Sequence, residues 1–248
     1  MLDFTEKKVL VTGASSGIGK ATAIMCASLG AYVFITGRNK DRLNECKDEC
    51  IKQNGKAEII PCELSNPNEI EKLVAHLPKL NGCVLNAGIS KVIPVKFIKQ
   101  SDINEIFSVN TQAQILMFNE LLRQKKLDLG CSVVFTASMA ALGEVAIGTS
   151  LYAASKSALC AFSKNAALEL AGKGIRCNTV CPGVVETNLT DGLHSFESDS
   201  NGNIKKYPLG RYGKPDDIAH AIAFLLSDIS SWITGIDLII DGGLHLKR

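Results

Sequence analysis

The stretch that decides the fold is Thr12-Gly13-Ala14-Ser15-Ser16-Gly17-Ile18-Gly19. It follows the short apolar run Val9–Thr12 and leads into a segment whose apolar residues recur with helical spacing as far as Leu29. A glycine-rich turn between a strand and a helix lets the backbone approach a pyrophosphate closely, and the positive helix N-terminus then faces the anion. The pattern predicts a nucleotide-binding turn made by Gly13, Ser15, Ser16, Gly17, Ile18 and Gly19.

Strand-like runs alternate with helical segments along almost the whole chain. The strands are expected at Val9–Thr12, Tyr32–Thr36, Glu58–Cys62, Cys83–Asn86, Val133–Ala137, Cys177–Cys181 and Asp237–Ile240. Most of these runs are continuously apolar, as strands covered on both faces require. After the first helix, further helices are expected at Lys40–Gln53, Asn68–Leu77, Ser101–Lys125, Tyr152–Lys173 and Pro215–Leu226. This alternation predicts one α/β domain over residues 1–248, a doubly wound Rossmann-type fold with a seven-stranded parallel sheet and helices on both faces.

One irregular stretch interrupts this pattern, at roughly Thr187–Arg211, and it is rich in Ser, Asn, Asp and Gly. Loops of that length in a compact domain are usually either functional or disordered. We expect a lid over the substrate here.

The composition excludes several classes of protein. The 248 residues carry 27 Lys and Arg against 25 Asp and Glu, so the net charge is +2. This balance lacks the basic field of nucleic-acid binders and the polybasic runs that hold a membrane surface. The nine cysteines include no C-x-x-C pair, and the four histidines are scattered. We therefore expect a cytoplasmic protein with free buried thiols and no metal, nucleic-acid or membrane partner.

The end of the second strand predicts the cofactor. An acidic side chain there accepts hydrogen bonds from the ribose 2′-hydroxyl of NAD, whereas an arginine favours the 2′-phosphate of NADP. This chain has Arg38 and Asn39 at that place, and its first acid is Asp41. The sequence therefore predicts NADP(H) in preference to NAD(H).

A group of polar residues is expected where the strands end. Tyr152 and Lys156 are four residues apart at the start of a predicted helix, so they share one face. A nearby cation, reinforced by the positive charge of a nicotinamide, is expected to lower the pKa of the phenol, which could then exchange a proton with a substrate oxygen. Ser138 ends the fifth strand and Asn86-Ala87-Gly88 ends the fourth, at the edge of the sheet where ligands bind. Asn110 lies in the helix between these strands.

These features together resemble the short-chain dehydrogenase/reductase family over essentially the whole chain. The matching segments are Thr12–Gly19, Asn86–Gly88, Asn110, Ser138, Tyr152–Lys156, Pro182–Thr187, Arg211–Ile218, Ile233–Gly235 and Asp241–Gly243. The resemblance implies that Tyr152 is the general acid in reduction and that Lys156 holds the nicotinamide ribose and lowers the pKa of the tyrosine. It also implies that Ser138 donates a hydrogen bond to the carbonyl oxygen, and that Asn110 anchors a water of a proton relay.

The same resemblance implies further contacts and an assembly. The residues it adds to the cofactor site are Glu63, Leu64, Asn86, Ala87, Gly88, Pro182, Gly183, Val185 and Thr187. Family members pair through the helices corresponding to Ser101–Lys125 and Tyr152–Lys173 and through the C-terminal strand, which implies a homotetramer.

The pattern is most similar to 3-oxoacyl-[acyl-carrier-protein] reductases, which implies a 3-oxoacyl thioester as one possible substrate, delivered on an acidic carrier. Lys173 stands at one basic position expected for docking the carrier, and Leu129 replaces the other. Sugar, polyol, steroid and small-ketone reductases share the other motifs and remain open. A dinucleotide-binding regulator without catalysis also remains open, although such a protein is expected to have lost Tyr152, Lys156 or Ser138.

Overall fold

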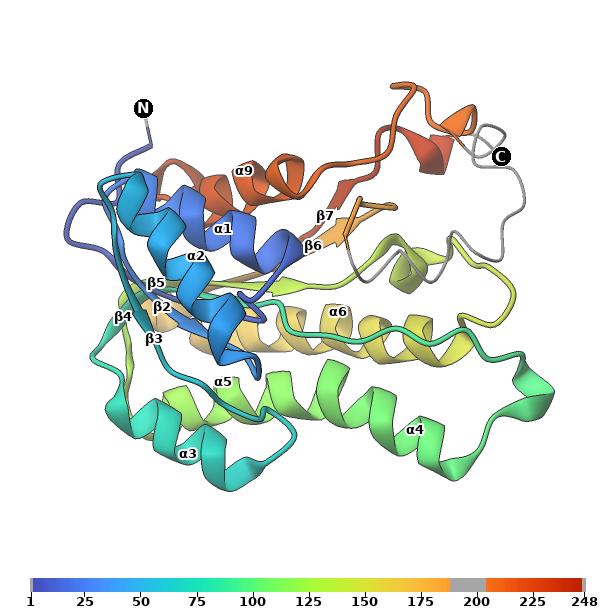
Figure 1. The fold of residues 1–248 in the computed structure, drawn as a ribbon, viewed down its shortest axis with the longest axis horizontal. Coiled ribbons are helices and arrows are strands. Elements are labelled where there is room, and N and C mark those ends of the chain that lie inside the picture. The colour runs from blue at the N-terminus through green and yellow to red at the C-terminus, as the bar shows by residue number, and fades with distance from the viewer. Residues whose placement is uncertain (1, 188–203, 247–248) are drawn as a thin grey trace.

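Seven parallel strands form one sheet in the computed structural model, which describes residues 2–187 and 204–246 (Figure 1). The strand order is β3-β2-β1-β4-β5-β6-β7, and every neighbouring pair runs parallel. The strands are β1 (Lys8–Thr12), β2 (Tyr32–Thr36), β3 (Lys56–Ile59), β4 (Leu80–Leu85), β5 (Leu127–Thr136), β6 (Arg176–Pro182) and β7 (Asp237–Ile240). The predicted doubly wound fold is confirmed.

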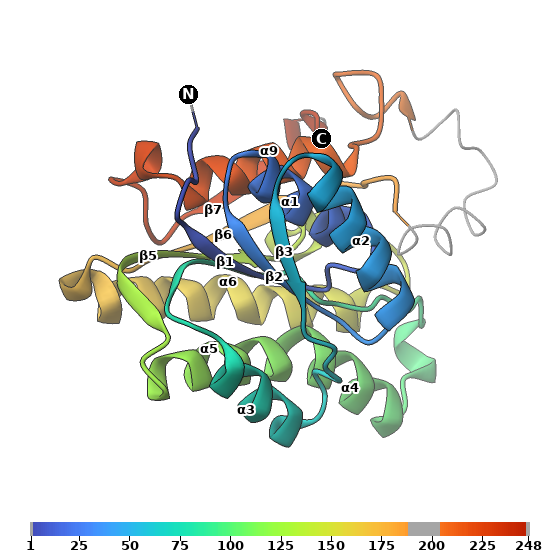
Figure 2. The ribbon, with the colours of Figure 1, turned by 60° about the vertical axis from the view of Figure 1, so that its left-hand side comes forward.

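Helices cover both faces of this sheet, as Figure 2 shows. One face carries α1 (Gly17–Ser28), α2 (Lys40–Lys52) and α9 (Pro215–Leu226). The opposite face carries α3 (Pro67–His76), α4 (Gln100–Phe107), α5 (Ala113–Arg123) and α6 (Ser150–Leu170). Each layer buries its own apolar cluster against the sheet, one around Leu10, Leu85 and Phe135 and the other around Val11, Ile35 and Val84. Neighbouring residues of one strand thus alternate between the two clusters.

The side chain of Thr12 joins β1 to β4 where both strands end. Its hydroxyl oxygen accepts hydrogen bonds from the backbone N–H groups of Asn86, at 2.9 Å, and Ala87, at 3.1 Å. In the sheet, β1 has β2 as its neighbour on one side and β4 on the other. The strand order therefore reverses between β1 and β4. In open α/β sheets the ligand crevice lies at this place.

The predicted helix Ser101–Lys125 is not continuous. It is divided into α4 and α5 by a π-helical turn at Ser108–Gln112. Apolar spacing did not reveal this turn, because one wide turn changes the helical phase only locally. Such π-helical turns occur frequently at functional sites.

Several strands also differ from their predicted bounds. β4 covers Leu80–Leu85 rather than Cys83–Asn86, and β1 and β6 are longer by one residue at one or both ends. β5 begins at Leu127 rather than Val133, since its first residues are polar or exposed and its register with β4 shifts between Leu80 and Gly82. β3 covers Lys56–Ile59 rather than Glu58–Cys62, because its pairing with β2 ends at Ile59. It is an edge strand of the sheet, so its apolar pattern is weaker.

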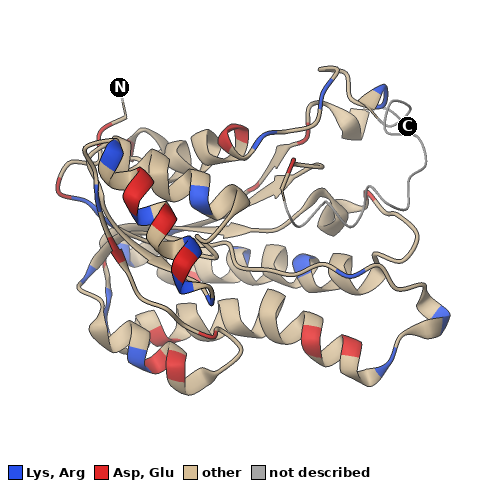
Figure 3. Cartoon of the chain, in the orientation of Figure 1, with Lys and Arg blue, Asp and Glu red and all other residues tan. Residues whose placement is uncertain are grey.

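Charged residues of both signs follow one another along α2, in keeping with the small net charge (Figure 3). The predicted lid over Thr187–Arg211 falls for the most part on residues 188–203, outside the described residues. Among the described helices, none combines the length and apolar character that crossing a membrane requires.

Candidate active site

A cavity of about 790 Å³ opens along the carboxyl ends of the strands. It gathers residues that are far apart in the sequence, from the glycine-rich turn after β1 to the segment after β6. The predicted site residues that line it are Gly13, Ser15, Ser16, Gly17, Ile18, Arg38, Asn39, Glu63, Leu64, Asn86, Ala87, Gly88, Ser138, Tyr152, Lys156, Pro182, Gly183, Val185 and Thr187. Two predicted residues, Gly19 and Asn110, do not line it.

The glycine-rich turn is shaped by close backbone contacts. Gly13 has φ +65, and a Cβ there would lie 2.8 Å from the Cα of Ala87. A Cβ on Gly19 would lie 2.3 Å from the carbonyl oxygen of Gly13. Both positions therefore require glycine, but for different reasons. Gly13 lets the turn pass against the end of β4, and Gly19 packs α1 against the turn rather than touching a ligand.

Cationic side chains line the cavity beyond the end of β2. Arg38 is 68% exposed, and its Nε lies 4.0 Å from a carboxylate oxygen of Glu63. Asn39 accepts a hydrogen bond from the backbone N–H of Arg42 at 3.0 Å and so caps α2. This cap places Arg42 in the wall of the same cavity. Arg42 was not among the predicted site residues, although an arginine four residues after Arg38 was a usable signal.

Lys156 and Tyr152 also line the cavity, and both lie on the first turns of α6. The Lys156 ammonium donates a hydrogen bond to the carbonyl oxygen of Thr136 at 2.8 Å, at the end of β5. Burial lowers the pKa of Lys156 to about 8. A Cβ on Gly88 would lie 3.1 Å from the Lys156 nitrogen, so the end of β4 closes against this ammonium.

The expected lowering of the Tyr152 pKa is wrong for the polypeptide alone. Burial raises the pKa of Tyr152, and a hydrogen bond with the Ser138 hydroxyl opposes that shift only in part. The physical reason is desolvation, which disfavours a phenolate. The ammonium of Lys156 is engaged by the Thr136 carbonyl.

Asn110 stands just behind the cavity, within the π-helical turn, and it is fully buried. Its Oδ1 accepts a hydrogen bond from the Ile89 backbone N–H at 2.8 Å, and its Nδ2 donates to the Ile89 carbonyl at 2.9 Å. The same nitrogen donates to the Ser155 hydroxyl at 3.0 Å. Asn110 thus ties the segment after β4 to α6, and its role as a water anchor stays a prediction.

Comparison with known proteins finds relatives over nearly the whole chain. The family model described as enoyl-(acyl carrier protein) reductase matches residues 13–245. The 3-oxoacyl-[acyl-carrier-protein] reductase FabG of Rickettsia felis is 34% identical over 244 residues, covering 98% of this chain and 99% of the relative. This chain belongs to the short-chain dehydrogenase/reductase family. Within that family it is also similar to cyclopentanol dehydrogenase of Comamonas testosteroni, at 30% identity over 96% of each chain.

Solved structures of the short-chain dehydrogenase/reductase family share this fold. A short-chain type dehydrogenase/reductase from Mycobacterium marinum superposes with a TM-score of 0.89 at 32% identity, over 98% of this chain and 97% of the other. A short chain dehydrogenase from Burkholderia cenocepacia, solved in complex with NADP, superposes with a TM-score of 0.89 at 31% identity. That match covers 98% of this chain and 99% of the other.

Two buried polar residues of this short-chain dehydrogenase/reductase support the site from behind. Ser155 donates to the Tyr152 carbonyl at 2.7 Å, and its own carbonyl accepts from the Thr111 hydroxyl at 2.9 Å. Gln114 donates from its side-chain nitrogen to the Ala87 carbonyl. Ser155 and Gln114 were not predicted from the sequence. The role of a polar residue inside a helix can be inferred only when its hydrogen-bond partners on other elements are known.

Proposed function

We propose that this protein is an NADP(H)-dependent oxidoreductase that interconverts a carbonyl group and a secondary alcohol. One observation carries the proposal: Tyr152, Lys156 and Ser138 line the same cavity as the glycine-rich turn and the two arginines after β2. Gly13 and Gly17 line this cavity, so at both positions the turn presents backbone rather than a side chain to a pyrophosphate. A nicotinamide dinucleotide, when bound, supplies or accepts the hydride.

The residues of this chain then transfer the proton and stabilise the negative charge that develops on the substrate oxygen. Ser138 donates a hydrogen bond to the substrate oxygen and stabilises its developing negative charge. Tyr152 gives its phenolic proton to that oxygen during reduction and takes it back during oxidation. The pKa of Lys156 is about 8, so its ammonium can release a proton near neutral pH. That proton can replace the one that Tyr152 gives to the substrate. Asn110 holds the Ile89 segment and α6 in the positions that this exchange needs.

The choice of NADP(H) rests on Arg38 and Arg42. Both line the cavity beside the turn, where the 2′-phosphate of NADP would place two negative charges. The NADP-bound structure from Burkholderia cenocepacia supports the same cofactor.

A 3-oxoacyl thioester is the first substrate class that we propose. Its support is the similarity to FabG reductases over nearly the full chain and the exposed Lys173, which offers a cation to an acidic carrier. A small cyclic ketone is the second. Leu129 is 82% exposed where a second basic residue is expected, and a cyclopentanol dehydrogenase is among the relatives. An apolar side chain contributes no attraction to an acidic carrier.

We further propose a cytoplasmic homotetramer. Leu168 on α6 is 81% exposed and Trp232, near the start of β7, is 98% exposed. Burial of these two large apolar side chains between subunits would remove their surface from water and so favour association. Light scattering should give a mass near four subunits, and a monomer at every concentration would contradict this.

A cofactor-consumption screen tests the proposed function. NADPH and NADH are offered in turn with an acetoacetyl thioester, a cyclic ketone, a keto-sugar and a ketosteroid. We expect oxidation of NADPH with at least one of them, fastest with the thioester. If the fluorescence of NADPH reports binding but none of these carbonyl compounds is reduced, the catalytically silent regulator is the better account.

A further inference from the structure

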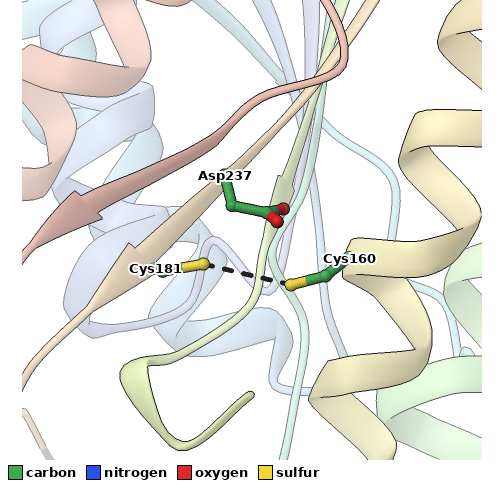
Figure 4. A group of neighbouring side chains, drawn as sticks. All are labelled: Cys160, Cys181 and Asp237. Carbon is green, nitrogen blue, oxygen red and sulfur yellow. Dashed lines mark hydrogen bonds between the residues drawn. The ribbon is translucent and has the colours of Figure 1, made fainter. Parts of the chain in front are cut away.

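Three potential metal ligands meet beneath the active site, on elements that are distant in the sequence. Cys160 lies on α6, Cys181 on β6 and Asp237 at the start of β7 (Figure 4). Among the described residues, this is the one place where three such side chains bring their ligand atoms within 4.8 Å of one another. Both thiols are buried, so the cluster is part of the interior.

The spacing of the two sulfur atoms fits a shared metal ion. Their separation is 4.0 Å. Two thiolates bound to one tetrahedral Zn²⁺ at about 2.3 Å each would lie about 3.8 Å apart. A disulfide needs about 2.05 Å, so the two side chains would have to move much further to form one.

The carboxylate of Asp237 offers a ligand atom that has no partner. Its side chain is only 10% exposed, and one oxygen pairs with the Lys164 ammonium. The other oxygen, Oδ1, is buried without a hydrogen-bond partner among the described residues. A buried carboxylate oxygen left unsatisfied costs free energy, and a bound cation would remove that cost.

The charges around the cluster also balance for a divalent ion. Two thiolates and one carboxylate bring three negative charges, and a divalent cation leaves one of them uncompensated. The Lys164 ammonium lies against Asp237 and supplies the remaining positive charge. Lys164 is 52% exposed, so its side chain can move aside and give an ion a path from solvent.

We propose that Cys160, Cys181 and Asp237 bind one thiophilic divalent ion of the Zn²⁺ class, with a fourth position left for water. Binding releases one proton from each thiol to solvent, and the two thiolates and the carboxylate form the bonds to the ion. This site goes beyond the proposed oxidoreductase function, since no step of that reaction uses it. It also departs from the sequence-based expectation of no metal, which relied on ligand spacing along the chain.

An ion at this site would act on the elements that hold the catalytic residues. Cys160 follows Lys156 by one turn of α6, and Cys181 directly precedes Pro182 in the cavity wall. Directly after β5, which neighbours β6, the backbone N–H of Ala137, next to Ser138, donates to the carbonyl of Val180, next to Cys181. The ion would therefore link α6 to β6 next to the active site and stabilise the folded state.

Metal binding to the full chain tests the proposal directly. The protein is treated with a chelator and a thiol reductant and is then titrated with Co²⁺ and Zn²⁺ separately. We expect one ion per chain by equilibrium dialysis, a thiolate-to-cobalt charge-transfer band, and a rise in Tm with Zn²⁺. Cys160→Ser and Cys181→Ser should abolish the band. Asp237→Asn, which keeps the side-chain shape, should weaken binding by at least about tenfold, since even outer-shell partners of a metal are worth that much.

A second thiol pair provides the matched control. Cys46 and Cys50 interact on α2, yet no third ligand joins them among the described residues. Cys46→Ser should therefore keep the band, the stoichiometry and the Tm rise. The proposal is overturned if no ion binds, if the band survives in Cys160→Ser, or if Cys46→Ser abolishes it. Formation of a Cys160–Cys181 disulfide without metal uptake would also overturn it. None of these readouts depends on reductase activity, so failure here leaves the proposed function untouched.

Discussion

The side-chain amide of Asn110 donates a hydrogen bond to the hydroxyl of Ser155 across 3.0 Å, joining the π-helical turn to α6. Because Ser155 in turn donates to the carbonyl of Tyr152, the position of the turn of α6 that carries Tyr152 depends on Asn110. This link gives the first prediction.

Asn110→Ala should lower both stability and turnover. The substitution leaves the N–H and the carbonyl of Ile89 without their partners in a partly buried place, which costs about 2–4 kcal/mol in all. Ser155→Ala removes a single hydroxyl and should cost only about 1 kcal/mol. Urea denaturation measures both values. Equal losses in the two variants would show that the Ile89 contacts of Asn110 contribute nothing.

Tyr152→Phe should abolish most of the activity without unfolding the protein. It removes the hydroxyl that we propose exchanges a proton with the substrate, and a positioned acid or base is worth about 10²–10⁴ in rate. Turnover is measured with saturating NADPH, and cofactor binding is followed by NADPH fluorescence. Tyr32→Phe is the matched control, because Tyr32 bonds Glu58 on the sheet edge, away from the cavity. Near-normal turnover in Tyr152→Phe would rule out this residue as the proton donor.

Arg38→Ala should weaken the preference for NADPH. One charge-assisted hydrogen bond is worth about 1.5–3 kcal/mol, so KM for NADPH should rise about 10–100-fold while KM for NADH stays nearly unchanged. Arg42→Ala should act in the same direction. The control is Arg123→Ala, which removes an exposed cation paired with Glu120 at the end of α5. An unchanged NADPH to NADH ratio in Arg38→Ala would disprove the assignment of that residue.

Stability should increase with pH in the range where Lys156 titrates. Its pKa is about 8 in the fold against 10.5 in the unfolded chain. Below pH 8 both states are protonated, and the cost of burying the charge is fully present. Between these two values the unfolded chain binds more protons, so the free energy of unfolding rises with pH, by about 3 kcal/mol at most.

Comparison with Lys156→Met isolates this contribution. Other titrating groups are common to both proteins and cancel in the difference of their unfolding free energies. As the pH rises from about 8 toward 10.5, we expect the free energy of unfolding of the wild type to increase relative to that of Lys156→Met. Urea denaturation measures both values. Parallel stability curves over that range would contradict a buried lysine with a lowered pKa.

Local sequence features were enough to predict much of the fold and part of the site. Continuous apolar runs separated by helical spacing led to the doubly wound sheet, since both signals depend only on neighbouring residues. Tyr152 and Lys156 share a helical face by spacing alone, and Arg38 follows from its place after β2. Each of these inferences needs only the order of elements and the rule that ligands bind where parallel strands end.

Long-range contacts decided the rest. Packing around a residue decides three features that the sequence did not predict. They are the π-helical turn that buries Asn110, the hydrogen bond from Gln114 to the chain after β4, and the upward shift of the Tyr152 pKa. The meeting of Cys160 with Cys181 depends on α6 crossing β6. Burial and the distance between side chains far apart in the chain arise only when the layers pack. The sequence alone therefore determined the family of fold and the residues proposed to react, and tertiary structure decided their electrostatics and brought together the thiol–carboxylate cluster beneath them.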